Sequence, residues 1–135
     1  MTAIASRPFS DSTDSLLRFA LRADATLTGL TGLAIAAAAG PLSSLSGLTA
    51  AQEFAVGAAF VLYGLVVFGL AALPKLRGAG MGVAIANVAY TVGSVLVVLA
   101  GVPVMTHTGA VLTLASGVYT AFFALLQYLG VRRLA

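Results

Sequence analysis

Residues 50–101 read AAQEFAVGAAFVLYGLVVFGLAALPKLRGAGMGVAIANVAYTVGSVLVVLAG, and this stretch decides the fold. It contains two long apolar runs, joined by the short segment Leu73-Pro74-Lys75-Leu76-Arg77. Each run has about the 20 residues that an α-helix needs to cross a hydrocarbon core of about 30 Å. Because Pro74 cannot continue a helix, it ends the first run. The stretch therefore predicts two membrane-spanning helices that run in opposite directions.

Similar apolar runs precede and follow this stretch. The four predicted spans cover roughly residues 16–40, 50–73, 80–101 and 108–129, after a cytoplasmic tail of residues 1–15. The connections are short, so consecutive helices are expected to be antiparallel neighbours. The sequence thus predicts an all-α polytopic membrane protein, a single antiparallel four-transmembrane-helix bundle.

The basic residues predict the orientation of this bundle. They lie before or at the start of the first span, between the second and third spans, and after the fourth: Arg7, Arg18, Arg22, Lys75, Arg77, Arg132 and Arg133. The connections Pro41–Ala50 and Gly101–Thr108 contain none. Cytoplasmic flanks of membrane spans collect Lys and Arg, because translocation of these residues is costly and the inner leaflet is anionic. Both termini are therefore predicted to be cytoplasmic.

The composition favours lipid as the solvent of this chain. Its 135 residues are 60% hydrophobic and 8% charged, with a mean hydropathy of +1.06, whereas a soluble domain is about 45–50% apolar and about 25% charged. The basic residues are spread over three flanks and form no patch, so a nucleic-acid partner is not expected. The excess of Arg over Lys, with abundant Ala, Gly and Val, suggests a GC-rich bacterial genome and hence a bacterial plasma membrane.

Small residues recur every four positions in the predicted spans. Gly32 and Ala36 belong to such a row in the first span, and Gly109 and Gly117 to another in the fourth. Helices in lipid associate through close backbone approach at small residues. These four residues are therefore predicted to pack the helices together. The alternative is that one row forms a homo-oligomer or binds a partner subunit.

Several polar residues are predicted to share the cytoplasmic third of the bilayer. Asp24 lies too deep, and is too short, to reach water as an Arg does, so it needs a hydrogen-bond donor. Asn87 and Gln127 are expected at the same depth on spans 3 and 4. The whole predicted group is Arg18, Arg22, Asp24, Asn87, Tyr90 and Gln127. It is consistent with a satisfied structural network, with a proton or ligand site, or with an interfacial position that needs no partner.

The remaining polar residues have simpler interpretations. Glu53 begins the second span, where an acidic side chain interacts favourably with the helix dipole. His107 is the only His, without Cys or neighbouring carboxylates, and makes a poor metal or haem ligand. Tyr63 and Tyr119 lie in mid-span, and each is expected to bond the backbone of a neighbouring helix.

Motifs that carry chemistry give no functional lead. The chain has no Cys, which excludes disulfides, thiolate nucleophiles and Fe–S sites. It also lacks the GxSxG, HExxH, Walker and GxGxxG patterns. The sequence therefore predicts a non-enzymatic protein, with no catalytic residue, cofactor or metal.

Three short motifs carry a resemblance. They are Leu17-Arg18, Leu21-Arg22-Ala23-Asp24-Ala25, Thr28-Gly29 and Gly32-Leu33 in the first span, Asn87-Val88-Ala89-Tyr90 with Ser94 in the third, and the ending Gln127-Tyr128-Leu129-Gly130-Val131-Arg132-Arg133. With them the chain resembles small bacterial four-span integral membrane proteins of unassigned function. The resemblance implies a compact four-helix bundle and supplies no activity. The chain is also the size of small multidrug transporters, but those carry a membrane-embedded Glu in the first helix, and the first span here has none.

Two functional hypotheses follow. The first is a small, non-enzymatic membrane protein that acts as an accessory or assembly subunit of a membrane complex, or as a homo-oligomer. The alternative is a small transporter or channel that uses Asp24 and Asn87 in the cytoplasmic half of the bundle.

Overall fold

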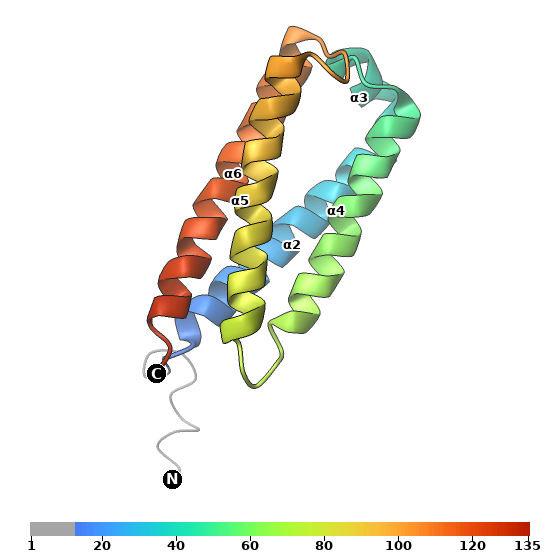
Figure 1. Cartoon of the computed structure of the whole chain (residues 1–135). Coiled ribbons are helices and arrows are strands. Elements are labelled where there is room, and N and C mark those ends of the chain that lie inside the picture. Colours follow the sequence, from blue (N-terminus) through green and yellow to red (C-terminus); the bar gives the residue numbers. More distant parts are fainter. Residues whose placement is uncertain (1–12) are drawn as a thin grey trace.

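The computed structural model describes residues 13–135, and its regular structure is entirely helical over that range. The described chain forms five helices: α2 (Ser15–Ala37), α3 (Ala39–Ser46), α4 (Ala50–Leu70), α5 (Arg77–Ala100) and α6 (His107–Arg132). The start of α2, the connection between α4 and α5, and the end of α6 lie at one end of the molecule (Figure 1). The short helix α3 and the α5–α6 connection lie at the other end. The all-α class predicted from the sequence is confirmed. Most of the predicted tail, residues 1–12, lies outside the described residues.

Local sequence explains where the helices begin and end. Thr49 Oγ1 accepts from the Gln52 amide at 3.0 Å, and Gln52 Oε1 accepts from the Thr49 amide at 2.9 Å, which is a complete capping box at the start of α4. Thr106 Oγ1 accepts from the Gly109 amide at 3.0 Å and caps α6. Gly101, with φ 68°, ends α5 in the left-handed conformation that glycine adopts without strain.

The first predicted span differs from the structure at its outer end. Its helix ends at Ala37 instead of residue 40, and the chain bends by 90° into α3, which occupies most of the predicted connection Pro41–Ala50. The reason is Pro41, which has no amide hydrogen to donate to Ala37 and whose ring crowds that carbonyl. Within α3, Pro41 falls in the first turn, where no intrahelical donor is needed.

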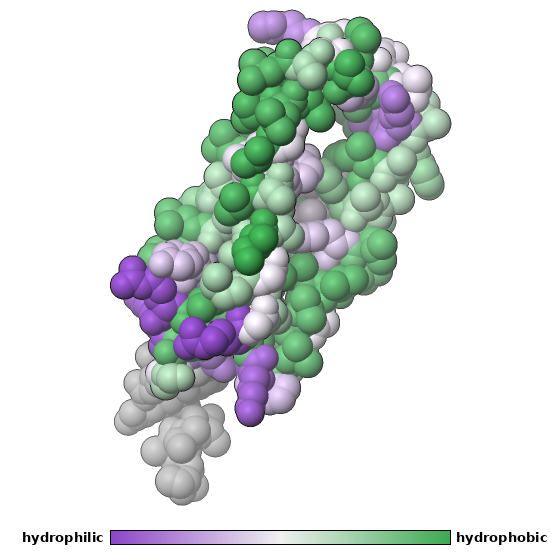
Figure 2. All heavy atoms as spheres, viewed as in Figure 1, coloured by the Kyte–Doolittle hydropathy of each residue, from purple (hydrophilic) through white to green (hydrophobic). Residues whose placement is uncertain are grey.

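The long helices meet the length and hydropathy that a membrane crossing requires. Three of them, α4, α5 and α6, pass that test singly, and α2 passes together with α3 as one bent pair. The described part of the chain therefore holds three to four candidate spans. Large apolar side chains on all of these helices are exposed, and Figure 2 shows them covering the flanks of the molecule. Such a surface suits lipid.

The helices pack in two pairs, α2 with α4 and α5 with α6, and the pairs meet along α2 and α6. A Cβ added at Gly32 would lie 2.8 Å from the Val61 amide nitrogen, and one at Gly57 would lie 2.6 Å from the Ala36 nitrogen. Gly117 lies against Ser94 of α5, and Gly109 against the Ser46 carbonyl of α3. The four residues predicted to pack helices therefore all lie at contacts between helices.

An apolar core fills the end of the molecule where α2 begins. It comprises Leu17, Leu21, Ala25, Val67, Ala71, Leu76, Val83 and Val131. Above this core α4 and α5 hardly approach each other, although a short connection joins them. The bundle is therefore closed at one end and open between α4 and α5 along part of its length.

Candidate functional site

The Asp24 carboxylate is the most heavily hydrogen-bonded group of the bundle. It lies on α2 with 1% of its surface exposed. Oδ2 accepts from Tyr63 at 2.6 Å, Gln127 at 2.8 Å and Asn87 at 3.0 Å. Oδ1 lies 2.9 Å from the Thr28 hydroxyl and 3.2 Å from the Tyr119 hydroxyl; because these two hydroxyls also bond each other at 2.8 Å, one of them donates to Oδ1 while the other donates to its neighbour. These donors come from α2, α4, α5 and α6, so one carboxylate ties all four long helices together.

The two amides of this shell also bond each other. Asn87 Nδ2 donates to Gln127 Oε1 at 2.9 Å as well as to Asp24, and Gln127 is completely buried. Over residues 13–135, every buried side-chain nitrogen or oxygen has a partner. Because a half-satisfied buried network is costly, this completeness fixes the rotation of each helix about its axis.

No cation balances Asp24 within the described chain. The ion pair there joins Arg18 to Asp14 at 2.7 Å, at the start of α2. A carboxylate in hydrocarbon without a counter-ion is expensive and persists only where donors replace its hydration. The shell around Asp24 consists of donors, which is the arrangement that a carboxylate requires.

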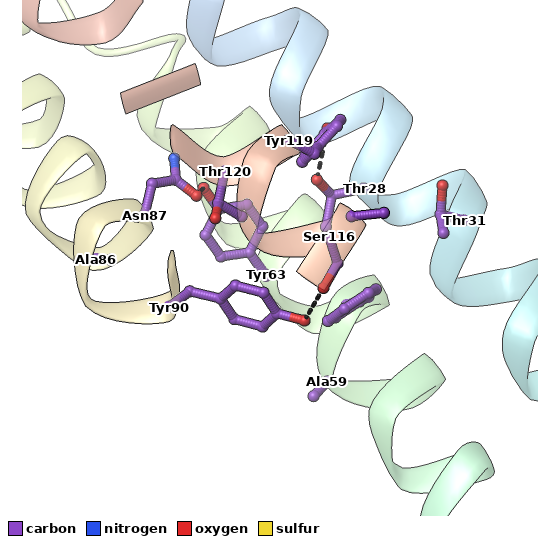
Figure 3. Close-up of a pocket in the computed structure, with 12 residues that line it drawn as sticks. Thr28, Thr31, Ala59, Tyr63, Ala86, Asn87, Tyr90, Ser116, Tyr119 and Thr120 are labelled. Atoms are coloured by element: carbon purple, nitrogen blue, oxygen red, sulfur yellow. Dashed lines mark hydrogen bonds between the residues drawn. The ribbon is translucent and has the colours of Figure 1, made fainter. Parts of the chain in front are cut away.

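A cavity of about 520 Å³ adjoins this shell (Figure 3). It is lined by side chains of all four long helices: Thr28, Thr31, Ala59, Phe60, Tyr63, Ala86, Asn87, Tyr90, Ala115, Ser116, Tyr119 and Thr120. At one end, Thr28, Tyr63, Asn87 and Tyr119 both line the cavity and bond Asp24. The carboxylate is thus separated from the cavity by a single layer of side chains.

The separation of α4 and α5 creates the cavity. Three of the side chains that face it are alanines, Ala59, Ala86 and Ala115, which leave space where larger residues would fill it. Phe60 and Tyr90 bridge the gap, with ring centroids 6.1 Å apart in an edge-to-face arrangement. Figure 2 shows the surface hollowed between α4 and α5. The cavity is therefore partly open to the surface between α4 and α5.

The structure brings only part of the predicted polar group together. Asp24, Asn87 and Gln127 form one hydrogen-bonded cluster. Tyr90 lies in the cavity wall, where its hydroxyl is 2.8 Å from Ser116 Oγ and not in the Asp24 shell. Three residues along α5 move a side chain by about 4.5 Å along the axis, which takes Tyr90 out of reach of Asp24.

The two arginines of the predicted group lie outside the Asp24 shell. Arg18 donates to the carbonyls of Ala71 at 2.6 Å and Leu73 at 3.1 Å, and so satisfies backbone acceptors that the end of α4 leaves free. Arg22 is exposed. Arg18 and Arg22 therefore do not join the polar network with Asp24 that the sequence predicted: the Arg18 side chain reaches the end of α4, and Arg22 lies on the surface.

The sequence did not place Tyr63, Tyr119 and Thr28 around Asp24. Tyr119 does bond backbone, the Asp24 carbonyl at 3.2 Å, but its hydroxyl also reaches the carboxylate and lies 2.8 Å from Thr28. Thr28 had a usable signal, since it follows Asp24 by four residues on the same helix face. The tyrosines had none, because their reach depends on how the helices are rotated.

Glu53 has a closer partner than the helix dipole. It lies in the first turn of α4, as expected, but it is only 6% exposed and accepts a short hydrogen bond from the Ser46 hydroxyl of α3. The Ser46 carbonyl also accepts a hydrogen bond from the Thr106 amide at 2.8 Å. This junction holds α3 against the starts of α4 and α6. His107 is exposed, and over residues 13–135 no cluster of three His, Asp or Glu side chains could hold a metal ion.

Comparisons with known proteins give no match: no protein-family model, no curated protein and no solved structure is similar to this chain.

Proposed function

We propose that the chain is a four-span protein of a bacterial plasma membrane, in which α2 and α3 together form the first span. The basic residues support an orientation in which the end where α2 begins faces the cytoplasm. Lys75, Arg77, Arg132 and Arg133 lie at the end of the bundle where α2 begins, and hydrophilic side chains gather there (Figure 2). By the rule that basic flanks are cytoplasmic, this end faces the cytoplasm.

Within this arrangement, we infer that the protein binds a small, mostly apolar molecule inside the membrane. One observation carries this function: the cavity of about 520 Å³ lined by all four long helices, apolar over most of its wall and polar at the Asp24 end. Ligand sites of proteins typically have this size and combine an apolar lining with a few convergent polar groups.

Equilibrium dialysis tests this function with two labelled probes, phenylbutyl-trimethylammonium and its neutral analogue, in which a quaternary carbon replaces the nitrogen. The protein is held in lipid nanodiscs, and empty nanodiscs give the background. At least one probe should bind saturably, with about one molecule per chain. Ala59→Phe, which fills the cavity, should abolish this binding. Ala58→Phe is the matched control, because Ala58 is exposed and does not line the cavity. Saturable binding of neither probe, or equal binding by the Ala59→Phe variant, would contradict the function.

The transporter hypothesis is a second candidate, and the position of Asn87 in the cavity wall, directly bonded to Asp24, favours it. It requires flux as well as binding. Probe uptake into proteoliposomes that is lost in Asp24→Asn, with the fold retained, would support transport. Binding without flux would leave a binding protein.

The accessory-subunit or homo-oligomer hypothesis stays a prediction from the sequence. The exposed apolar flanks suit a protein partner as well as lipid. Native mass spectrometry of the gently extracted protein decides it. A stable second component or a multiple of the chain mass would support it, and a single chain would exclude it.

A further inference from the structure

We propose that the cavity selects lipophilic organic cations, in which a compact substituted ammonium group is attached to an apolar body. This inference rests on the proposed binding function and names the chemical class of the ligand. It follows from the charge of Asp24, from the direction of the hydrogen bonds in its shell, and from the aromatic lining of the cavity.

Asp24 has no counter-ion within the described chain. Asp24 is 1% exposed, and within residues 13–135 no cationic side chain pairs with it. Tyr63 and Asn87 touch the carboxylate at 2.6 and 3.0 Å and also form the cavity wall. A charge in low-dielectric surroundings acts on a group one side-chain layer away much more strongly than it would in water. A cation at this end of the cavity would supply the balancing charge that the described chain lacks.

The hydrogen bonds of the shell point the same way. Tyr63 donates its hydroxyl hydrogen to Asp24, and the Asn87 amide hydrogens go to Asp24 and to Gln127. The hydroxyls of Thr28 and Tyr119 bond Asp24 and each other. The donors at this end are therefore engaged on the side away from the cavity. A ligand meets oxygen lone pairs and rings there, which attract a cation and offer an anion nothing to accept from.

Aromatic rings complete the match. Phe60, Tyr63, Tyr90 and Tyr119 line the cavity, and substituted ammonium groups are recognised by aromatic rings through cation–π attraction. Because Tyr63 donates a hydrogen bond to a carboxylate, its ring becomes richer in electrons, which strengthens that attraction. Beyond the rings, Ala59, Ala86 and Ala115 provide an apolar wall for the ligand body.

The two dialysis probes separate a preference for charge from a preference for shape, because they have the same shape and differ in one positive charge. In the unmodified protein the ammonium probe should bind about tenfold or more tightly than the carbon analogue. In Asp24→Asn that preference should fall to about twofold or less. The Asn variant should still fold: its carbonyl can accept from Tyr63, Asn87 and Gln127, and its amide can donate to Thr28 and Tyr119, whose hydroxyls accept as well as donate.

Each outcome decides a different claim. Equal binding of both probes in the unmodified protein, lost in Ala59→Phe, overturns the cation preference and leaves the binding function standing. Tighter binding of the neutral probe overturns the preference as well. Binding of neither probe overturns both claims. If Asp24→Asn fails to fold, the unmodified protein alone decides whether the ammonium probe is preferred over the carbon analogue. Tyr63→Phe, which keeps the charge of Asp24 and the aromatic ring, should then reduce this preference without removing it.

Discussion

The two carboxylates buried in this bundle are held in different ways. Asp24, 1% exposed, receives hydrogen bonds from donors on four helices. Glu53, 6% exposed, receives one from the neighbouring helix α3 and lies in the first turn of its own helix, near the positive end of the dipole. A carboxylate near a helix start needs little further support, whereas one in mid-helix needs donors that only tertiary structure can bring. Asp24 is therefore the group whose loss should affect the whole bundle.

The two carboxylates are expected to lie toward opposite sides of the membrane, Asp24 toward the cytoplasm and Glu53 toward the outside. Cysteine labelling tests this topology with a yes-or-no result. The chain has no Cys, so single introduced cysteines report unambiguously. Val104→Cys, at a residue 80% exposed in the α5–α6 connection, should react with an impermeant thiol reagent added to intact cells. Gly78→Cys, at the start of α5, should react only after lysis. Labelling of Gly78→Cys but not Val104→Cys in intact cells would show that the bundle has the opposite orientation.

The largest effect on stability is expected for Asp24→Leu. The substitution leaves Tyr63, Asn87 and Gln127 without their acceptor, and should lower the free energy of unfolding by about 2–4 kcal/mol. Glu53→Leu leaves one hydroxyl, Ser46, without its acceptor and should cost about 1 kcal/mol. Unfolding by SDS titration measures both. If Glu53→Leu proved as costly as Asp24→Leu, the four-helix role of Asp24 would be wrong.

The comparison also depends on the close approach of α2 and α4, which brings Tyr63 to Asp24. Gly32→Leu would force a side chain against the backbone of α4 at Val61 and should destabilise by about 1–3 kcal/mol. Gly93→Leu is the matched control, because no atom lies within 4 Å of a Cβ built there. Thermal melting in detergent should separate the two variants clearly. Equal melting temperatures would mean that the α2–α4 contact does not hold the bundle.

The smallest effect sharpens the role of a single donor. Tyr63→Phe removes one hydrogen bond to Asp24 and should cost about 1 kcal/mol. Tyr90→Phe removes a hydroxyl that bonds Ser116 at an exposed position and should cost about 0.5 kcal/mol or less. SDS titration of both variants is the measurement. A larger loss for Tyr90→Phe would show that the cavity wall, and not the Asp24 shell, stabilises the bundle.

Much of the fold could be predicted because its signals are local. The capping box at Thr49 and Gln52, the end of α5 near Gly101 and the helical class itself depend on neighbouring residues. The end of the first helix was predicted at residue 40 but lies at Ala37, about one helical turn earlier, because Pro41 disrupts the helix at the carbonyl four residues before it. The bend into α3 was not predicted.

The site was predicted less completely, for a physical reason. Asp24, Asn87 and Gln127 could be grouped by depth alone, since each is polar and lies a similar distance from the same end of the bundle. Depth does not give rotation about the helix axis. Tyr63 and Tyr119 were therefore not predicted to bond Asp24, and Arg18 was grouped with Asp24 by depth although its side chain reaches the end of α4. The cavity could not be predicted either, because it depends on the separation of α4 and α5, which the sequence of each helix does not determine.

Anomalous diffraction can show directly whether a cationic group binds in the cavity at the Asp24 end. Crystals soaked with the trimethylarsonium analogue of the probe carry a heavy scatterer at the position of the positive charge. One arsenic peak is expected inside the cavity, beside Tyr63 and Tyr119 and within one side-chain layer of Asp24. A peak at the far end beside Thr31 and Phe60, or peaks only on the lipid-facing surface, would contradict it.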